Sequence, residues 1–254
     1  MEMVVFTTGT RRGMAALMVA AALAGPWTAR ASAGPADVRV TRAPGRVVLE
    51  VADEHVTIRK EVRADQSVAT ITTRADSLVL TIRRGALTVS GPWGTMAMGA
   101  DAGAAYDRLL VVLQRSDAAA RARALLGRVT DGPDTFTGQS LLLTRSILEF
   151  GTGSTAAVSE HRQWAAQRAA ELAKAPKAVP AVARISWQSR GPGDCWDLYS
   201  AEAIRIAQDF EECTADLAWY EAHMWAGCSL IYAVRAEGAM AWFIACNGGL
   251  PFSG

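Results

Sequence analysis

Residues 34–92 alternate apolar and polar side chains with a period of two, the pattern of β-strands that bury one face. Val47, Leu49 and Val51 form one such run, and similar runs follow along the region. Turn-forming residues interrupt the pattern at intervals of roughly ten residues, as at Ala43-Pro44-Gly45 and Arg84-Gly85. This spacing predicts an antiparallel meander of five or six short strands whose apolar face needs a cover.

The period becomes helical after Gly91-Pro92, so residues 93–175 are predicted to form a helical region. Its apolar positions predict helices over residues 106–126, 137–150 and 155–174. Residues 176–194 are rich in proline and glycine and are predicted to be a linker or a surface loop. A sheet followed by helices predicts an α+β fold.

All four cysteines lie in the last predicted region, residues 195–254, at Cys195, Cys213, Cys228 and Cys246. The first and last intervals are both 18 residues, which is five turns of a helix. In an antiparallel pair of helices, residues at the same level have numbers with a constant sum, and only one of the three pairings satisfies this at both ends. We therefore predict helices over 195–217 and 225–246 that are joined by Cys195–Cys246 and Cys213–Cys228.

Two other interpretations of this region are weaker. Zinc binding is disfavoured because the chain has no Cys-x-x-Cys pair and the cysteines are too far apart along the helices, so no metal is predicted. A membrane span over residues 226–246 would place Arg235 and Glu237 at its centre, where both side chains are costly. A buried, disulfide-linked helix explains the same apolar composition, so no integral span is predicted after export.

Residues 1–33 have the organisation of a cleaved signal peptide. Arg11 and Arg12 precede an apolar run over residues 13–24, and Ala31-Ser32-Ala33 matches the small residues of a cleavage site. The run is too short to cross a bilayer. It fits the general secretory route better than the twin-arginine route, because only the arginine pair of the twin-arginine motif is present. Export to the periplasm or out of a bacterial cell would supply the oxidising compartment that disulfides need.

The charge composition excludes one class of partner. The chain has 26 basic and 25 acidic residues, a formal net charge of +1. Nucleic-acid binding driven by charge needs a basic excess that releases counterions from phosphates. No nucleic-acid partner is therefore predicted, and the 50% apolar and 20% charged composition is that of an ordinary globular protein.

The register of the predicted hairpin also indicates a candidate polar site. It places Arg235 level with Ile206 and hence between Glu202 and Asp209 on the cysteine-bearing face. One interpretation is a partly buried ion cluster that fixes the register of the two helices. The other is a functional polar site inside an aromatic groove. The residues of that predicted groove are Trp196, Tyr199, Tyr232 and Trp242.

A second candidate site is the turn between the two C-terminal helices. Its predicted binding tip consists of Trp219, Tyr220, His223 and Trp225. An exposed aromatic tip would contact a protein partner or a soft metal such as copper, unless its rings fold back onto the protein. The other two histidines, His55 and His161, are predicted to be solvated surface residues.

No catalytic or cofactor motif is present: the chain lacks a nucleophile elbow, a His-Glu-x-x-His metal motif, a phosphate loop, a dinucleotide fingerprint and a haem attachment site. No cofactor is predicted. The favoured hypothesis is an exported non-catalytic protein that binds an unknown protein or small molecule. The alternative is an exported hydrolase-like enzyme that uses Glu202, Asp209, Arg235 or His223. A concave pocket with Arg235 and two carboxylates would favour the enzyme, and a sealed seam would favour the binding protein.

Overall fold

A computed structural model describes residues 36–43, 45–98, 103–132, 134–174, 192–217 and 222–246. All of them fall within one structural unit, Gly34–Gly254. The predicted signal peptide, residues 1–33, lies outside the described residues, as do residues 176–191 of the predicted linker.

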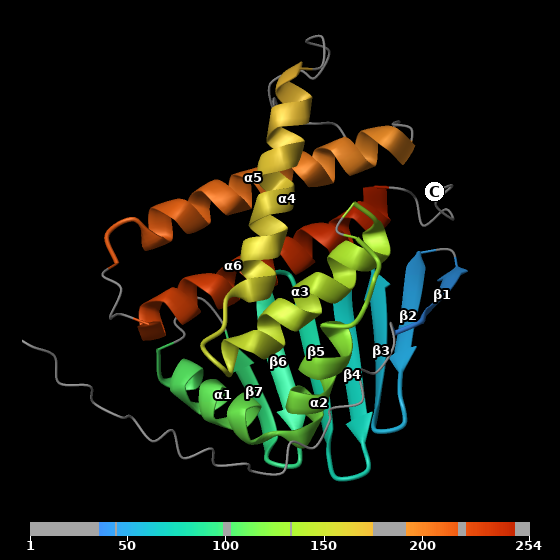
Figure 1. Ribbon diagram of the computed structural model, residues 1–254, viewed down its shortest axis with the longest axis vertical. Helices are drawn as coiled ribbons and strands as arrows, with labels where there is room; N and C mark the ends of the chain where they lie inside the picture. The colour runs from blue at the N-terminus through green and yellow to red at the C-terminus, as the bar shows by residue number, and fades with distance from the viewer. Residues whose placement is uncertain are drawn as a thin grey trace, which may run out of the picture. The chain divides into compact units, whose positions relative to one another are not determined.

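The N-terminal part is a seven-stranded antiparallel meander in which each strand pairs with the next along the chain (Figure 1). The strands are β1 (Val38–Ala43), β2 (Arg46–Ala52), β3 (Val56–Arg63), β4 (Gln66–Thr73), β5 (Ser77–Arg83), β6 (Ala86–Gly91) and β7 (Gly94–Met98). The α+β fold and the meander are confirmed, but the predicted number of strands was too small. Gly91-Pro92 was interpreted as the end of the sheet, whereas it leads into the turn before β7.

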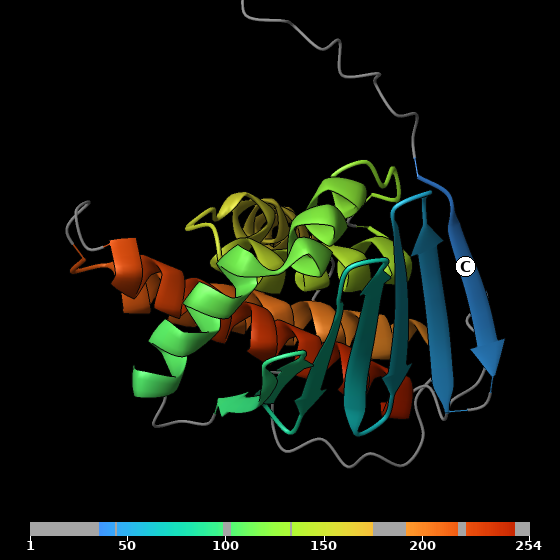
Figure 2. The same ribbon diagram turned by 90° about the horizontal axis from the view of Figure 1, so that it is seen from below.

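Six helices follow the sheet: α1 (Gly103–Arg115), α2 (Asp117–Leu126), α3 (Phe136–Phe150), α4 (Ala156–Lys174), α5 (Pro192–Thr214) and α6 (Ala222–Cys246). They lie on one side of the sheet, which leaves its other face uncovered by helices (Figure 2). Helices α2 and α6 contact β3, β4 and β5, and α1 contacts β7. Helices α4 and α5 pack on each other and, through α3 and α6, complete a second layer of helices above the first.

The helix predicted over residues 106–126 is in fact two helices, because Ser116 starts a new one. The Ser116 hydroxyl accepts a hydrogen bond from the backbone N–H of Ala119, which is an N-cap interaction. Asp76, in the turn between β4 and β5, accepts hydrogen bonds from Ser116 Oγ and from the backbone N–H of Ala118. A carboxylate from the sheet therefore binds the N-terminus of α2, where the helix dipole favours negative charge.

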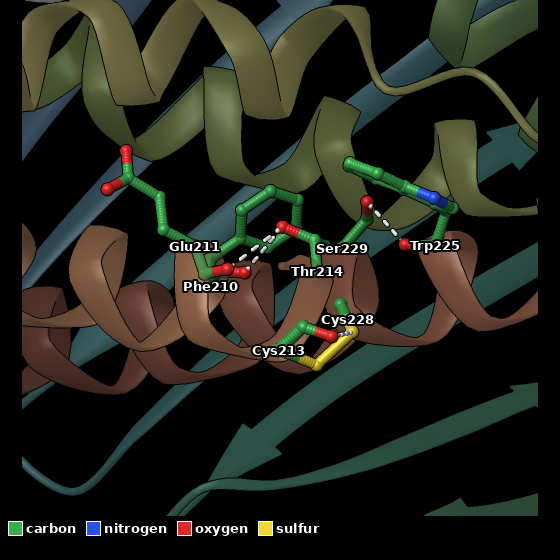
Figure 3. The surroundings of a disulfide bond; sticks show 7 residues. All are labelled: Phe210, Glu211, Cys213, Thr214, Trp225, Cys228 and Ser229. Carbon is green, nitrogen blue, oxygen red and sulfur yellow. Dashed lines mark hydrogen bonds between the residues drawn. A yellow bond between two sulfur atoms is a disulfide. The ribbon is translucent and has the colours of Figure 1, made fainter. Parts of the chain in front are cut away.

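Helices α5 and α6 form the predicted antiparallel hairpin. Both predicted disulfides are present, with Cα–Cα distances of 5.8 Å for Cys195–Cys246 and 6.0 Å for Cys213–Cys228. Figure 3 shows the second of them at the end of the hairpin near the turn. Helix α5 starts at Pro192, so its first residues belong to a helix and not to the predicted linker.

Helix α6 is the central helix of the fold. Residues Met224–Cys246 are long and apolar enough to cross a membrane, but 67% of the most apolar window is buried inside the protein. The sheet, α3 and α5 all contact α6. This is the packing of a core helix, and it accounts for the apolar composition of α6 without a bilayer.

Candidate functional site

The predicted polar cluster forms between the two helices of the hairpin. Arg235 Nη2 on α6 donates to Asp209 Oδ2 on α5 at 2.5 Å. Glu202 does not pair with Arg235, because both of its oxygens bind the guanidinium of Arg205 on the same helix. Arg205 also donates to Asp209 at 3.2 Å. Asp209 is thus shared by two arginines.

Arg205 is the member of this cluster that the hairpin register did not reveal. Its spacing of three residues from Glu202 and four from Asp209 is the usual signal of ion pairs on one helix face. The side chains of Arg235 and Asp209 are 35% and 34% exposed, so the cluster lies at the surface. Exposed pairs of this kind contribute at most about 1 kcal/mol each to stability. The cluster is therefore accessible to solvent and to a partner.

Glu202 and Arg235 line a surface groove of about 450 Å³ between the hairpin and the tips of the sheet. Helix α6 contributes Gly238 and Ala241 to the groove. The turns after β3 and β5 form the opposite side. The complete lining is Ala64, Asp65, Ile82, Arg84, Gly85, Glu202, Arg235, Gly238 and Ala241. Helix α6 contacts β3 and β5, and the turns that follow these two strands contribute to the groove.

Arg84 holds an unusual backbone conformation beside this groove. It has a φ of +50°, and it is the one non-glycine residue of the described ranges with a positive φ. Gly85 follows with a φ of +75°, and the two residues connect Arg83 to Ala86. Two left-handed residues in a two-residue hairpin are typical of a type I′ turn, which prefers Asn-Gly. Arginine at the first position is therefore conformationally costly.

The predicted binding tip is only partly described. Trp219 and Tyr220 lie outside the described residues, and so does the side chain of His223. Trp225 packs edge-on against Phe210 of α5, with ring centroids 6.3 Å apart (Figure 3). This ring folds back onto the hairpin, which removes it from an exposed tip, and binding by the rest of the tip stays a prediction.

His161 is buried, so its predicted place on a solvated face was wrong. Its exposed fraction is 0%. Its Nδ1 forms a short hydrogen bond with the Tyr232 hydroxyl, and its Nε2 lies 3.3 Å from the Tyr199 hydroxyl. The prediction failed because α3, α5 and α6 all pack against α4, which covers the face that bears His161. Burial lowers the pKa of His161 from 6.5 to about 3, so the ring is neutral at physiological pH.

The aromatic groove predicted around the hairpin is a filled core. Tyr199 and Tyr232 are buried, and the ring of Tyr199 contacts Trp164, Trp196 and Phe243. The Tyr199 hydroxyl donates to Gln139 Oε1 at 3.0 Å. Burial raises the pKa of the Tyr199 hydroxyl, which keeps it protonated as a donor. The aromatic residues thus bring a hydrogen-bonded network into the interior.

A buried ion pair, which the sequence interpretation missed, connects the sheet to the hairpin. Lys60 Nζ on β3 lies 2.8 Å from Glu237 Oε2 on α6, and both side chains are 1% exposed. Lys60 also donates to Thr144 Oγ1 at 2.8 Å and to the carbonyl oxygen of Ser140, both on α3. Burial lowers the pKa of Lys60, and the carboxylate of Glu237 opposes that shift. The sequence did contain a signal for this burial. Lys60 lies between Ile58 and Val62 at the alternate positions of β3 whose side chains are buried.

The ionisable groups considered above therefore fall into two sets. Lys60 and Glu237 are buried and bind each other, and the buried ring of His161 binds the hydroxyls of Tyr232 and Tyr199. The charged side chains that line the groove between the hairpin and the strand tips are accessible to solvent.

A second groove of about 490 Å³ lies between α4 and α5, where the Arg162–Glu211 ion pair borders alanine side chains. Within the described ranges no group of three or more histidine, cysteine, aspartate or glutamate side chains is placed to hold a metal ion.

No protein-family model, curated protein or solved structure matches the chain. The fold and the covalent chemistry alone define its class. It is an α+β protein with two disulfides, and disulfides of this kind indicate an oxidising compartment outside the cytoplasm.

Proposed function

We propose that the protein is an exported, non-catalytic binding protein that takes up a small molecule or part of a partner protein in the cell envelope or outside the cell. The observation that carries this proposal is the 450 Å³ groove between the α5–α6 hairpin and the strand tips. Its volume lies in the range of small-molecule sites. Export rests on the signal-peptide pattern of residues 1–33 together with the two disulfides.

The construction of the groove supports binding. One side belongs to a hairpin that is covalently linked at both ends, and the other belongs to tight turns of the sheet. Walls held in this way lose little conformational entropy when a ligand binds, which favours affinity. The buried ion pair of Lys60 and Glu237 attaches the hairpin to the sheet, and Glu237 precedes the groove residue Gly238 in α6.

The alternative of a hydrolase has weaker support. The groove does combine Arg235 with two carboxylates, Glu202 and Asp65. Each carboxylate is already engaged by its own arginine, however: Glu202 by Arg205, and Asp65 by Arg83 at 3.6 Å. The described lining of the groove contains no serine, threonine, cysteine or histidine to act as a nucleophile or as an imidazole base. The lining therefore suits recognition better than acyl or glycosyl transfer.

The test is recovery of bound material with the groove open or filled. We would immobilise the mature protein, residues 34–254, and compare it with Gly238→Trp, which places an indole ring in the groove. Ala166→Trp, which fills the α4–α5 groove in the same way, is the matched control. We expect wild type and Ala166→Trp to retain the same envelope component, identified by mass spectrometry, and Gly238→Trp to lose it. Equal recovery by all three proteins would reject the proposal.

A further inference from the structure

The charges in and beside the groove do not balance. Four arginines (Arg83, Arg84, Arg205 and Arg235) and three carboxylates (Asp65, Glu202 and Asp209) lie there. Arg205 and Arg235 pair with the two carboxylates of α5, and Arg83 pairs with Asp65. Arg84 makes no hydrogen bond or ion pair with any residue in the described part of the chain. Each acid of the groove thus has an arginine, and one guanidinium is left for a ligand.

The unpaired arginine also stands where the backbone disfavours it. A left-handed φ at Arg84 is costly for a side chain of this size, and asparagine or glycine would satisfy the turn better. A conformationally costly residue beside a groove points to a role outside the turn itself. Because Arg84 is exposed and lines the groove, its guanidinium is accessible to an incoming anion.

The floor of the groove is small and apolar. Ile82 and Ala241 line it and Gly238 leaves it open, while Ala64 belongs to the exposed turn on the opposite side. Apart from its chain neighbours and the backbone of its own helix, a Cβ atom placed on Gly238 meets no described atom within 4 Å. The floor therefore has room for a short hydrocarbon chain next to the cationic rim, which fits an amphiphilic ligand better than an inorganic ion.

We propose that the groove binds a small organic anion with a short apolar chain, held by Arg84 at its head group and by Ile82, Gly238 and Ala241 along its chain. This inference rests on the proposed binding function and names its ligand class. The head group is a carboxylate or a phosphate, since a guanidinium binds both in bidentate fashion.

The experiment is calorimetric titration of the mature protein with four probes that share an eight-carbon chain: octanoate, octyl phosphate, octylammonium and octanol. Three variants accompany the wild type. Arg84→Asn removes the cation and fits the turn, so the fold is retained. Arg84→Lys keeps the charge and loses the bidentate geometry. Arg74→Asn removes the same charge from the exposed turn between β4 and β5, which does not line the groove.

We expect one or both anionic probes to bind the wild type and Arg74→Asn, and octylammonium not to bind. Arg84→Asn should weaken binding about tenfold or more, because a charge-assisted hydrogen bond is lost, and Arg84→Lys should be intermediate. The relative affinities of octanoate and octyl phosphate identify the head group. Equal binding by wild type and Arg84→Asn, binding of octylammonium or octanol in place of the anions, or binding of none of the four probes would overturn the inference.

Failure of the ligand class is distinguishable from failure of the binding function. If Gly238→Trp still loses an envelope component while the anionic probes do not bind, the groove binds a partner of another chemistry. If the probes do not bind and Gly238→Trp retains everything that the wild type retains, both proposals are wrong.

Discussion

Lys60 and Glu237 form an ion pair across 2.8 Å between β3 and α6, and both side chains are sealed from solvent. The two residues are 177 positions apart in the chain. The pair therefore attaches the C-terminal hairpin to the N-terminal sheet in a single register. Buried pairs are costly to desolvate, so their value lies in specifying an arrangement more than in adding net stability.

Removing one partner of this pair should destabilise the protein strongly. Lys60→Met leaves the Glu237 carboxylate buried without its cation, and we expect a loss of about 3–5 kcal/mol in the free energy of unfolding. Glu237→Leu should cost a similar amount. The double variant should recover to within about 2 kcal/mol of the wild type, because no isolated charge stays buried. Urea unfolding of the four proteins measures this, and additive losses in the double variant would contradict the account.

His161 should make stability depend on pH. Its pKa is about 3 in the folded protein and 6.5 when unfolded, so acid favours the unfolded state, which binds the proton more readily. The contribution is fully present above pH 6.5 and is lost as pH falls from there toward 3. Between pH 7.5 and pH 5 the wild type should lose about 2 kcal/mol more stability than His161→Gln. Parallel pH profiles of the two proteins would show that His161 is not buried in its neutral form.

The two disulfides should contribute unequally and without additivity. Cys213–Cys228 closes 15 residues and Cys195–Cys246 closes 51, so the loop-entropy relation gives about 3 and about 4 kcal/mol respectively. Because one loop lies inside the other, each bridge contributes less while the other is present, so replacing all four cysteines by serine should cost slightly more than the sum of the two paired replacements. Denaturant unfolding of the paired and fourfold variants measures these losses. A fourfold loss equal to the sum would argue against the nested arrangement.

Two glycines should respond to alanine in opposite directions. A Cβ at Gly138 would lie 1.9 Å from the carbonyl oxygen of Gly132, so Gly138→Ala should force the backbone apart and cost about 2 kcal/mol or more. The open surroundings of Gly238 on α6 leave only the helix-propensity term, so Gly238→Ala should raise stability by about 0.5–1 kcal/mol. Thermal melts of both variants test the packing on the two sides of the fold. A stabilised Gly138→Ala would contradict it.

Local patterns were enough to predict the meander and the hairpin. Turn residues such as Ala64-Asp65 and Arg84-Gly85 mark strand ends through their own chemistry, and cysteine spacing on a helix maps directly onto distance. The disulfide pairing followed because Cys195 and Cys213 had to meet partners at both ends of one seam.

The features that were missed depend on packing between distant segments. His161 has a polar neighbour in Glu160 and reads as a surface residue until α5 and α6 cover it. Lys60 interrupts an apolar face, and its burial is explained only by partners on distant helices, Glu237 on α6 and Thr144 and Ser140 on α3. The groove combines turns of the sheet with α6, so neither element predicts it alone.

Chemical-shift mapping of the ¹⁵N-labelled mature protein during titration with the anionic eight-carbon probes tests the central claim most directly. The account predicts concentration-dependent shifts at the amides of Asp65, Gly85 and Gly238, which surround the groove on both sides. It also predicts that these shifts are much reduced in Arg84→Asn. Shifts centred on Ala166 and Gln208 of the α4–α5 groove, or none at all, would contradict it.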